Sequence, residues 1–291
     1  MKKFTVVICT YNRHFLIDKC LKNVLNNSIM PEKIIIIDQN YNFSTYNKII
    51  NLFNVKNYKN YLIIRNLIQR GLTKSKNFSL KHIDTQYVFF IDDDISLERN
   101  FFLENINLIS KQKAHGVSGV ISNYEGSPIR NFFYYILNHN IFKDNRYYFI
   151  NYKKLKKKYP YFSVFQLPGG ITCFDNKIFK KVNFDEKFII HNYEDVEFNI
   201  RLRKKYMNLK LYINMKTEAV DLLKRKSKEN IFMRFYYLRL IYLKNQNYSV
   251  LFYYYLSFLG LIFSNILNIK FNDYFKIYEK LKQADRKVKT F

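Results

Sequence analysis

The stretch from Tyr87 to Asp94 constrains the fold of this chain more than any other. Five apolar residues at 87–91 run directly into three adjacent acids, Asp92, Asp93 and Asp94. This pattern predicts a buried strand whose carboxyl end, the ligand-binding edge of an open α/β sheet, carries three carboxylates. Adjacent carboxylates repel one another, and a divalent cation that prefers oxygen ligands, Mg²⁺ or Mn²⁺, would relieve the repulsion. The alternative is a solvated acidic turn that opens a helix near Ser96.

The composition predicts a folded protein with a large core. Of the 291 residues, 48% are hydrophobic and 19% are aromatic, which excludes an intrinsically disordered chain. Lysine and arginine number 49 against 23 acidic residues, and the net charge of +26 favours an anionic partner, such as a phosphorylated substrate or an anionic membrane surface. The basic residues are scattered and no nucleic-acid-binding motif occurs, so we expect no nucleic-acid partner.

The three cysteines, Cys9, Cys20 and Cys173, lie far apart and form no CxxC pair. Their spacing predicts neither a disulfide framework nor a zinc site, and it suits a reducing compartment. The apolar run at 4–9 is too short for a signal peptide and is typical of a first strand instead. We therefore expect a cytoplasmic protein.

Short apolar runs alternate with segments of helical periodicity. Strands are expected at 4–9, 33–37, 61–64, 87–91, 117–121, 171–174 and 210–213, and helices at 15–25, 44–53 with Ser44 as a cap, 71–82, 97–111, 176–182 and 194–206. This alternation predicts an α/β protein with a parallel, doubly wound sheet. Residues 122–165 are irregular, and their lysine-rich run at 153–158 is typical of a solvated segment, with a contact to phosphate or lipid headgroups as the alternative.

Polar side chains follow three of the predicted strands. Thr10, Asp38 and Asp92 each stand at the point where an apolar run ends. Parallel strands end at the same edge of a sheet, so we expect these three side chains to converge there.

Two further motifs lie in the second half of the chain. Gly169 and Gly170 are adjacent in a chain with only 7 glycines, which indicates either a close backbone approach to a ligand or a turn with positive φ. Glu194 and Asp195 open the helix expected over 194–206, and acids at a helix start match the helix dipole, which by itself is a complete structural explanation.

The C-terminal region is different in character. Residues 248–269 carry no charge and are long enough to span a bilayer, but they contain several Tyr, Ser and Asn. We favour a helix or helical hairpin that lies at the surface of an anionic membrane. A core helix or a contact within a homo-oligomer is the alternative.

Taken in order, these motifs resemble glycosyltransferase family 2, the inverting, nucleotide-sugar-dependent enzymes with the GT-A fold. The resemblance covers roughly 4–221 and rests on Val7–Arg13, Ile34–Asp38, Gly71–Asn77, the D-x-D element at Phe89–Asp94, Pro168–Gly170 and the E-D motif at Glu194–Asp195. It implies a GT-A catalytic domain at 1–225, with a donor-binding half at 1–121 and an acceptor-binding half at 122–225. A helical, aromatic-rich extension would follow at 226–291.

The resemblance also implies roles for individual residues. The donor-binding residues would be Thr10, Tyr11, Asn12, Arg13, Asp38, Gly71, Lys76, Asn77, Asp92 and Asp93, and the acceptor side would hold Gly169, Gly170 and Glu194. Asp94 and Asp92 would hold Mn²⁺ or Mg²⁺ against the diphosphate, while Asp93 would face elsewhere by strand alternation. Asp195 would be the catalytic base, and Glu194 would orient the acceptor.

The chain departs from the family pattern in three ways. Lys76 stands where many members have Arg, so that a forked contact with the diphosphate becomes a point charge. Gln39 and Asn40 replace the usual small residues after Asp38. A histidine often found downstream of the E-D helix is missing, and Asp221 lies near its expected place.

The implied function is the transfer of a sugar from a nucleoside-diphosphate sugar, with UDP favoured, to a hydroxyl of a glycan or lipid-linked acceptor. Bacterial surface polysaccharide synthesis at the inner face of the cell membrane is the expected setting. One alternative is a sugar-phosphate nucleotidyltransferase, which is disfavoured because 10–13 lacks the Gly-rich loop of that class. The other is a non-catalytic protein that binds anions at the membrane surface, which the net charge motivates.

Overall fold

The computed structural model describes residues 2–67, 71–123, 153, 155–187 and 194–223, together with 241, 252 and 255 singly. The chain divides into two compact units, one of Met1–Ile190 with Glu194–Lys224 and one of His191–Tyr193 with Arg225–Phe291. Almost all of the second unit lies outside the described residues. The predicted extension at 226–291, the uncharged run at 248–269 and the domain limits therefore stay predictions.

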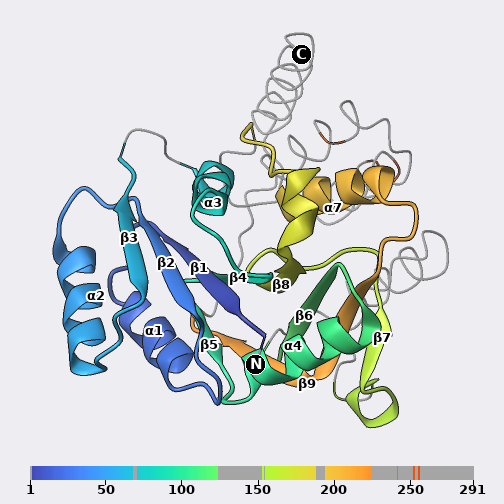
Figure 1. Ribbon diagram of the computed structural model, residues 1–291, viewed down its shortest axis with the longest axis horizontal. Coiled ribbons are helices and arrows are strands. Elements are labelled where there is room, and N and C mark those ends of the chain that lie inside the picture. The colour runs from blue at the N-terminus through green and yellow to red at the C-terminus, as the bar shows by residue number, and fades with distance from the viewer. Residues whose placement is uncertain are drawn as a thin grey trace, which may run out of the picture. The chain divides into compact units, whose positions relative to one another are not determined.

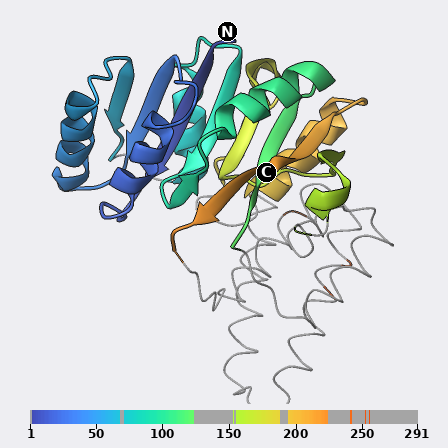
Figure 2. The same ribbon diagram turned by 90° about the horizontal axis from the view of Figure 1, so that it is seen from below.

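The described part of the first unit holds one nine-stranded sheet in the order β3-β2-β1-β4-β8-β6-β9-β5, with β7 beside β9 (Figures 1 and 2). The strands are β1 Phe4–Thr10, β2 Lys33–Asp38, β3 Tyr61–Arg65, β4 Tyr87–Asp92, β5 Ile95–Leu97, β6 Gly116–Ile121, β7 Tyr161–Ser163, β8 Ile171–Asp175 and β9 Leu211–Asp221. The helices are α1 Ile17–Leu25, α2 Ser44–Val55, α3 Leu72–Leu80, α4 Phe101–Gln112, the 3₁₀ helix η3 Asn176–Lys180 and α7 Glu194–Lys205.

Two hydrophobic clusters, one on each face of the sheet, make a three-layer α/β core. Buried side chains of α1, α2 and α4 pack on one face. Those of η3 and α7 pack on the other, joined by partly buried side chains of α3 (Figure 1). The central strands are buried on both faces, which is why they consist of unbroken apolar runs such as the four isoleucines of β2. None of the described helices is long and apolar enough to cross a bilayer.

Parallel pairing of β1 with both β2 and β4 brings the predicted polar strand ends together. Thr10 of β1 stands opposite Asp38 of β2. Its neighbour Cys9 stands opposite Asp92 of β4. The expected convergence of the three strand ends at one edge of the sheet is confirmed.

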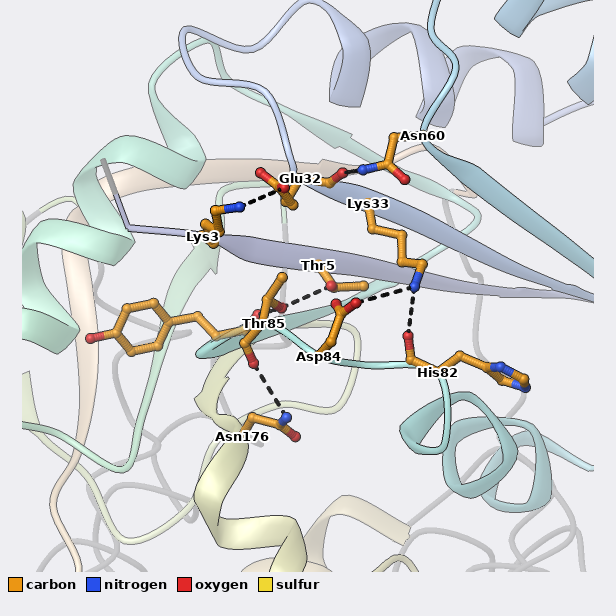
Figure 3. A network of polar contacts seen from close by, with 10 residues as sticks. Lys3, Thr5, Glu32, Lys33, Asn60, His82, Asp84, Thr85 and Asn176 are labelled. Carbon is orange, nitrogen blue, oxygen red and sulfur yellow. Dashed lines mark hydrogen bonds and ion pairs between the residues drawn. The ribbon is translucent and has the colours of Figure 1, made fainter.

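A polar network occupies the opposite edge, at the amino ends of the same strands (Figure 3). The hydroxyl groups of Thr5 and Thr85 lie 2.8 Å apart, and the Asn176 amide donates to the carbonyl of Thr85 at 3.3 Å. Lys33 of β2 forms an ion pair with Asp84 at 3.7 Å. These contacts tie the starts of β1 and β2 to the turn before β4, and they hold the strands in register.

The structure corrects several local predictions. Ile95–Leu97 is strand β5, because it pairs antiparallel with β9, so the predicted helix begins only at Phe101 and the alternative helix start near Ser96 is wrong. For the same reason the strand expected to end at 213 continues to Asp221. Strand β8 runs antiparallel to β4 and β6, and β7 forms inside the irregular segment. Ser44 is the first residue of α2 and does not cap it.

Gly119 in β6 tests how tightly the sheet packs against α4. A Cβ atom at this position would lie 2.6 Å from Cε2 of Phe101 and 2.7 Å from Oγ1 of Thr217. We expect Gly119→Ala to lower the free energy of unfolding by about 1–3 kcal/mol through overpacking, measured by urea denaturation. The matched control is Lys111→Ala on the exposed face of α4, which should stay within about 0.5 kcal/mol of the wild type.

Candidate functional site

Arg13 holds two of the three adjacent aspartates. Its Nη1 donates to Oδ1 of Asp93 at 2.8 Å and to Oδ2 of Asp94 at 2.7 Å. The side chain of Arg13 is 20% exposed, while those of Asp93 and Asp94 are 3% and 0% exposed. The guanidinium of Arg13 relieves the repulsion between these neighbouring carboxylates in this structure. A divalent cation was the partner predicted from the sequence. Arg13 was predicted to bind the donor, and its contact with the aspartates was not foreseen.

Burial raises the pKa of the Asp93 carboxyl to about 6, although the nearby hydroxyl of Thr10 and the charge of Arg13 act in the opposite direction. The neighbouring charge of Asp94 adds to the rise. Asp93 therefore belongs to a buried ionic cluster beneath the sheet edge.

Asp92 is half-buried and rests on the glycine pair. Its backbone N–H donates to the carbonyl of Gly170 at 2.8 Å. A Cβ atom at Gly170 would lie 2.1 Å from Oδ2 of Asp92, and one at Gly169 would lie 3.1 Å from Oε1 of Glu194 and 3.4 Å from the Cβ of Asp195. Among the described residues, the only glycine with positive φ is Gly71. The positive-φ turn is therefore wrong for the glycine pair, whose close contacts in this structure are with protein side chains, and an approach to a ligand stays a prediction.

The fit of a metal ion differs between the two predicted ligands. Asp92 is partly exposed and offers the hard oxygen donors that Mg²⁺ and Mn²⁺ prefer. Asp94 is fully buried, and its Oδ2 is already paired with the guanidinium of Arg13. In the described ranges, no three His, Cys, Asp or Glu side chains are grouped so as to hold a metal. Asp221 stands opposite Ile95, the residue after Asp94, so it does lie beside the aspartates.

Asp38 is the last residue of β2, and its two carboxylate oxygens differ in their hydrogen bonding. Its Oδ1 accepts from the side-chain amide of Asn40 at 2.6 Å and from the backbone N–H of Asn40 at 3.0 Å. Its Oδ2 is buried and has no hydrogen-bond partner among the described residues. Asn40 also donates to Thr45 at 3.1 Å and accepts from the backbone N–H of Asn12 at 2.6 Å. Asn40, noted in the sequence only as a departure from the family, is the residue that orients Asp38.

Arg65, which the sequence analysis did not single out, closes the rim beside Asn40. Its guanidinium donates to the carbonyls of Asn40 and Tyr41 at 2.9 Å each. It also lies 3.8 Å from the ring centroid of Phe43. The turn after β1 leaves Tyr11 46% exposed beside this rim. No pattern in the sequence marked Arg65, because it stands at the end of an ordinary short strand.

The residues of α3 that were predicted to bind the donor contact segments of the predicted acceptor-binding half. Gly71 is the N-cap of the helix, with a φ of 130° that favours glycine. Lys76 donates to the carbonyl of Gly169 at 3.1 Å, and Asn77 exchanges hydrogen bonds with the backbone of Phe184. These contacts differ from the predicted diphosphate contacts.

Glu194 and Asp195 form the first turn of α7, as predicted. Glu194 is buried, and Asp195 is partly exposed. Oδ1 of Asp195 accepts from the backbone N–H of Val196 at 2.8 Å, and the Asn199 amide donates to its carbonyl at 2.7 Å. Asp195 is therefore held at the helix start, and the residue is partly exposed.

Replacement of Arg13 tests the buried ionic cluster. Arg13→Met leaves Asp93 and Asp94 without their guanidinium partner, and we expect the free energy of unfolding at pH 8 to fall by about 3–5 kcal/mol. Without Arg13 the pKa of Asp93 rises further, so protonation removes part of the penalty as the pH falls, and the loss should be smaller at pH 5.

Urea denaturation at both pH values, without divalent cations, measures the effect of Arg13→Met. Lys19→Met on the exposed face of α1 serves as the control. An equal loss for Arg13→Met at the two pH values would contradict the ionic cluster.

The fold is shared with solved glycosyltransferases of the GT-A type. The S. aureus protein TarS, residues 1–349 with UDP-GlcNAc, matches 97% of this chain and 80% of its own, with a TM-score of 0.65 and 16% identity. The mannosyltransferase PcManGT of Pyrobaculum calidifontis, with GDP-Man and Mn²⁺, matches 84% of this chain and 64% of its own, with a TM-score of 0.61 and 15% identity. The predicted GT-A fold is thereby confirmed.

Curated relatives match over shorter stretches. The GalNAc(5)-diNAcBac-PP-undecaprenol β-1,3-glucosyltransferase of Campylobacter jejuni is 26% identical over 132 residues, which cover 45% of this chain and 42% of that protein. The poly(ribitol-phosphate) β-glucosyltransferase of Bacillus spizizenii is 30% identical over 127 residues, or 40% of this chain and 20% of that protein. The match therefore spans less than half the length of either relative.

The family assignment rests on a longer match. The family model described as Glycosyl transferase family 2 aligns with residues 5–182, which is more than half of the chain. This range includes β1, β2, β4 and the glycine pair that together form the edge described above. The chain belongs to glycosyl transferase family 2.

Proposed function

We propose that this protein transfers a sugar, with inversion, from a nucleoside-diphosphate sugar to a hydroxyl of a glycan or lipid-linked acceptor in bacterial surface polysaccharide synthesis. One observation carries the proposal. The carboxylate of Asp92 lies against Gly170, while Glu194 and Asp195 lie against Gly169. Consecutive Cα atoms are about 3.8 Å apart. Asp92, the predicted ligand for the leaving group, and Asp195, the predicted base, therefore lie on either side of the Gly169–Gly170 dipeptide.

The donor end of the site would recognise the nucleoside through Asp38. The buried, unpartnered Oδ2 of Asp38 is an acceptor that a nucleobase N–H would satisfy, since a buried polar atom without a partner is costly. Asn40 holds the other oxygen, so the carboxylate cannot turn away. Complexes of structural neighbours with UDP-GlcNAc and GDP-Man support a nucleotide-sugar donor, of which we favour a UDP-sugar.

Asp92 stands where the diphosphate would lie. A divalent cation, Mn²⁺ or Mg²⁺, held by Asp92 and, as the resemblance implies, by Asp94, would neutralise charge on the leaving diphosphate. Structural neighbours that contain Mn²⁺ support this part of the proposal.

Asp195 would act as the base. It accepts the proton of the acceptor hydroxyl as that oxygen bonds to the anomeric carbon, and the bond to the diphosphate oxygen breaks on the opposite face. The nucleoside diphosphate leaves with the bonding electrons. Glu194, adjacent on the first turn of α7, would orient the acceptor.

The acceptor and the setting are the least direct parts of the proposal. Relatives named for an undecaprenol-linked and a poly(ribitol-phosphate) substrate support an acceptor of the bacterial cell surface. We further propose that the protein acts at the cytoplasmic face of the membrane. It would contact anionic lipid peripherally through 248–269, and it would form a homo-oligomer.

Replacement of Asp195 tests the base. Asp195→Asn keeps the size of the side chain but cannot accept the proton, so we expect turnover to fall by about 10²–10⁴-fold. The affinity for UDP, measured by calorimetric titration, should be unchanged because Asp38 and Asp92 are not altered. A variant that keeps near wild-type turnover would show that another residue takes the proton.

Gly170→Ala tests the position of Asp92. The new methyl group would occupy the place of the Asp92 carboxylate and displace it, so we expect the affinity for UDP with Mn²⁺ to fall about 10-fold or more. Gly169→Ala is the matched control, because its Cβ meets no atom closer than 3.1 Å.

Chelation with EDTA completes the test of the metal. It should stop turnover of the wild type and remove the difference in UDP affinity between wild type and Gly170→Ala. Full wild-type activity in EDTA would contradict metal dependence.

A further inference from the structure

Lys76 is a charged side chain in a buried place. Only 3% of its side-chain surface is exposed, although it stands in the middle of the short helix α3. An ammonium group is rarely buried unless other groups replace its water, because burial of an unpaired charge is costly. The groups that surround Lys76 therefore show what the residue does.

Within the described ranges, the two polar partners of Lys76 come from the predicted acceptor side, the 168–170 segment and the start of α7. Its Nζ donates to the carbonyl of Gly169 at 3.1 Å. The same atom lies 3.6 Å from Oε1 of Glu194, whose side chain is 8% exposed. Lys76 thus connects the donor-half helix to the glycine pair and to the start of α7.

Two aromatic rings cover the ammonium group. Nζ lies 5.7 Å from the ring centroid of Phe90 in β4 and 5.2 Å from that of Phe184, both within the range of a cation–π contact. Phe184 in turn stacks on Phe198 of α7, with ring centroids 4.3 Å apart. One of the two covering rings is therefore packed against the same helix that carries Glu194.

Asn77 holds the covering ring in place. Its amide donates to the carbonyl of Phe184 at 2.9 Å and accepts from the N–H of Phe184 at 2.9 Å. It also donates to Glu186 at 3.0 Å. Lys76 and Asn77, which are adjacent in α3, therefore both connect this helix to the predicted acceptor-binding half.

We propose that Lys76 is a positioning residue, which holds Glu194 and the 168–170 segment in the geometry that Asp195 needs, and that it does not bind the donor diphosphate. The inference rests on the proposed function and reassigns one residue within it. The ammonium group is already engaged by Gly169 and Glu194 and is covered by two rings. With 3% of its side chain exposed, it offers almost no surface to a diphosphate.

A double-mutant cycle tests the proposal. Lys76→Met, Glu194→Gln and the double variant are compared with wild type for turnover and for UDP affinity with Mn²⁺. We expect each single variant to lose about 100-fold in turnover, as misplacement of catalytic groups does. The double variant should lose no more than the worse single variant, because both changes break the same contact. UDP affinity should stay within about 2-fold of wild type for Lys76→Met.

Controls separate positioning from folding. Lys81→Met removes a lysine from the exposed end of the same helix and should leave turnover unchanged. If Lys76→Met does not fold, Lys76→Gln replaces it, because the amide can still donate to Gly169 while the charge beside Glu194 is removed. A 10-fold or greater loss of UDP affinity in the Lys76 variant, or multiplied losses of turnover in the double variant, would overturn the proposal.

Failure of the proposed function gives a different result. A wild-type protein that neither binds nucleotides nor transfers sugar contradicts the proposed function before any variant is compared. The pairing of Lys76 with Glu194 is then decided by melting temperatures. A double variant whose loss is smaller than the sum of the single losses supports the pairing, and additive losses overturn it.

Discussion

Parallel pairing of β1 with β2 on one side and β4 on the other is the constraint on which the site depends. It aligns three strand ends, so that Thr10, Asp38 and Asp92 lie at one edge of the sheet. Backbone hydrogen bonds set this register, and a slip by one residue would turn each side chain to the opposite face. The polar network at the other edge, around Thr5 and Thr85, supports the same register (Figure 3).

Buried charge is the second organising element. Two cations in the first half of the chain each hold carboxylates inside the fold, Arg13 with Asp93 and Asp94, and Lys76 with Glu194. Such pairs contribute little net stability compared with apolar packing, but removal of one partner is costly, so they specify where each group must lie. Asp92 and Asp195, which we propose for the chemistry, are partly exposed, in contrast to the acids held in these pairs.

Much of the fold followed from local pattern. The apolar runs that became β1, β2, β3, β4, β6 and β8 were predicted to within one or two residues. Except for the edge strand β3, these strands are buried on both faces, which makes their apolar runs continuous. Strands β5, β7 and the second half of β9 were missed, since they depend on partners distant in the chain and have no pattern of their own. The sequence at 95–97 favours the start of a helix, but pairing with β9 makes this segment a strand.

The amino-acid sequence by itself determined the class of fold and the residue types available for chemistry. Apolar runs that end in Asp38 and Asp92, a glycine pair and an acid pair at a helix start are all local features. Only the tertiary structure decided which acid has which neighbour. It placed Arg13 on Asp93 and Asp94, Lys76 on Glu194, and the carboxylate of Asp92 on Gly170. These contacts join residues about 80 to 120 positions apart, and no periodicity in a sequence encodes such pairings, because they arise from the packing of one element on another.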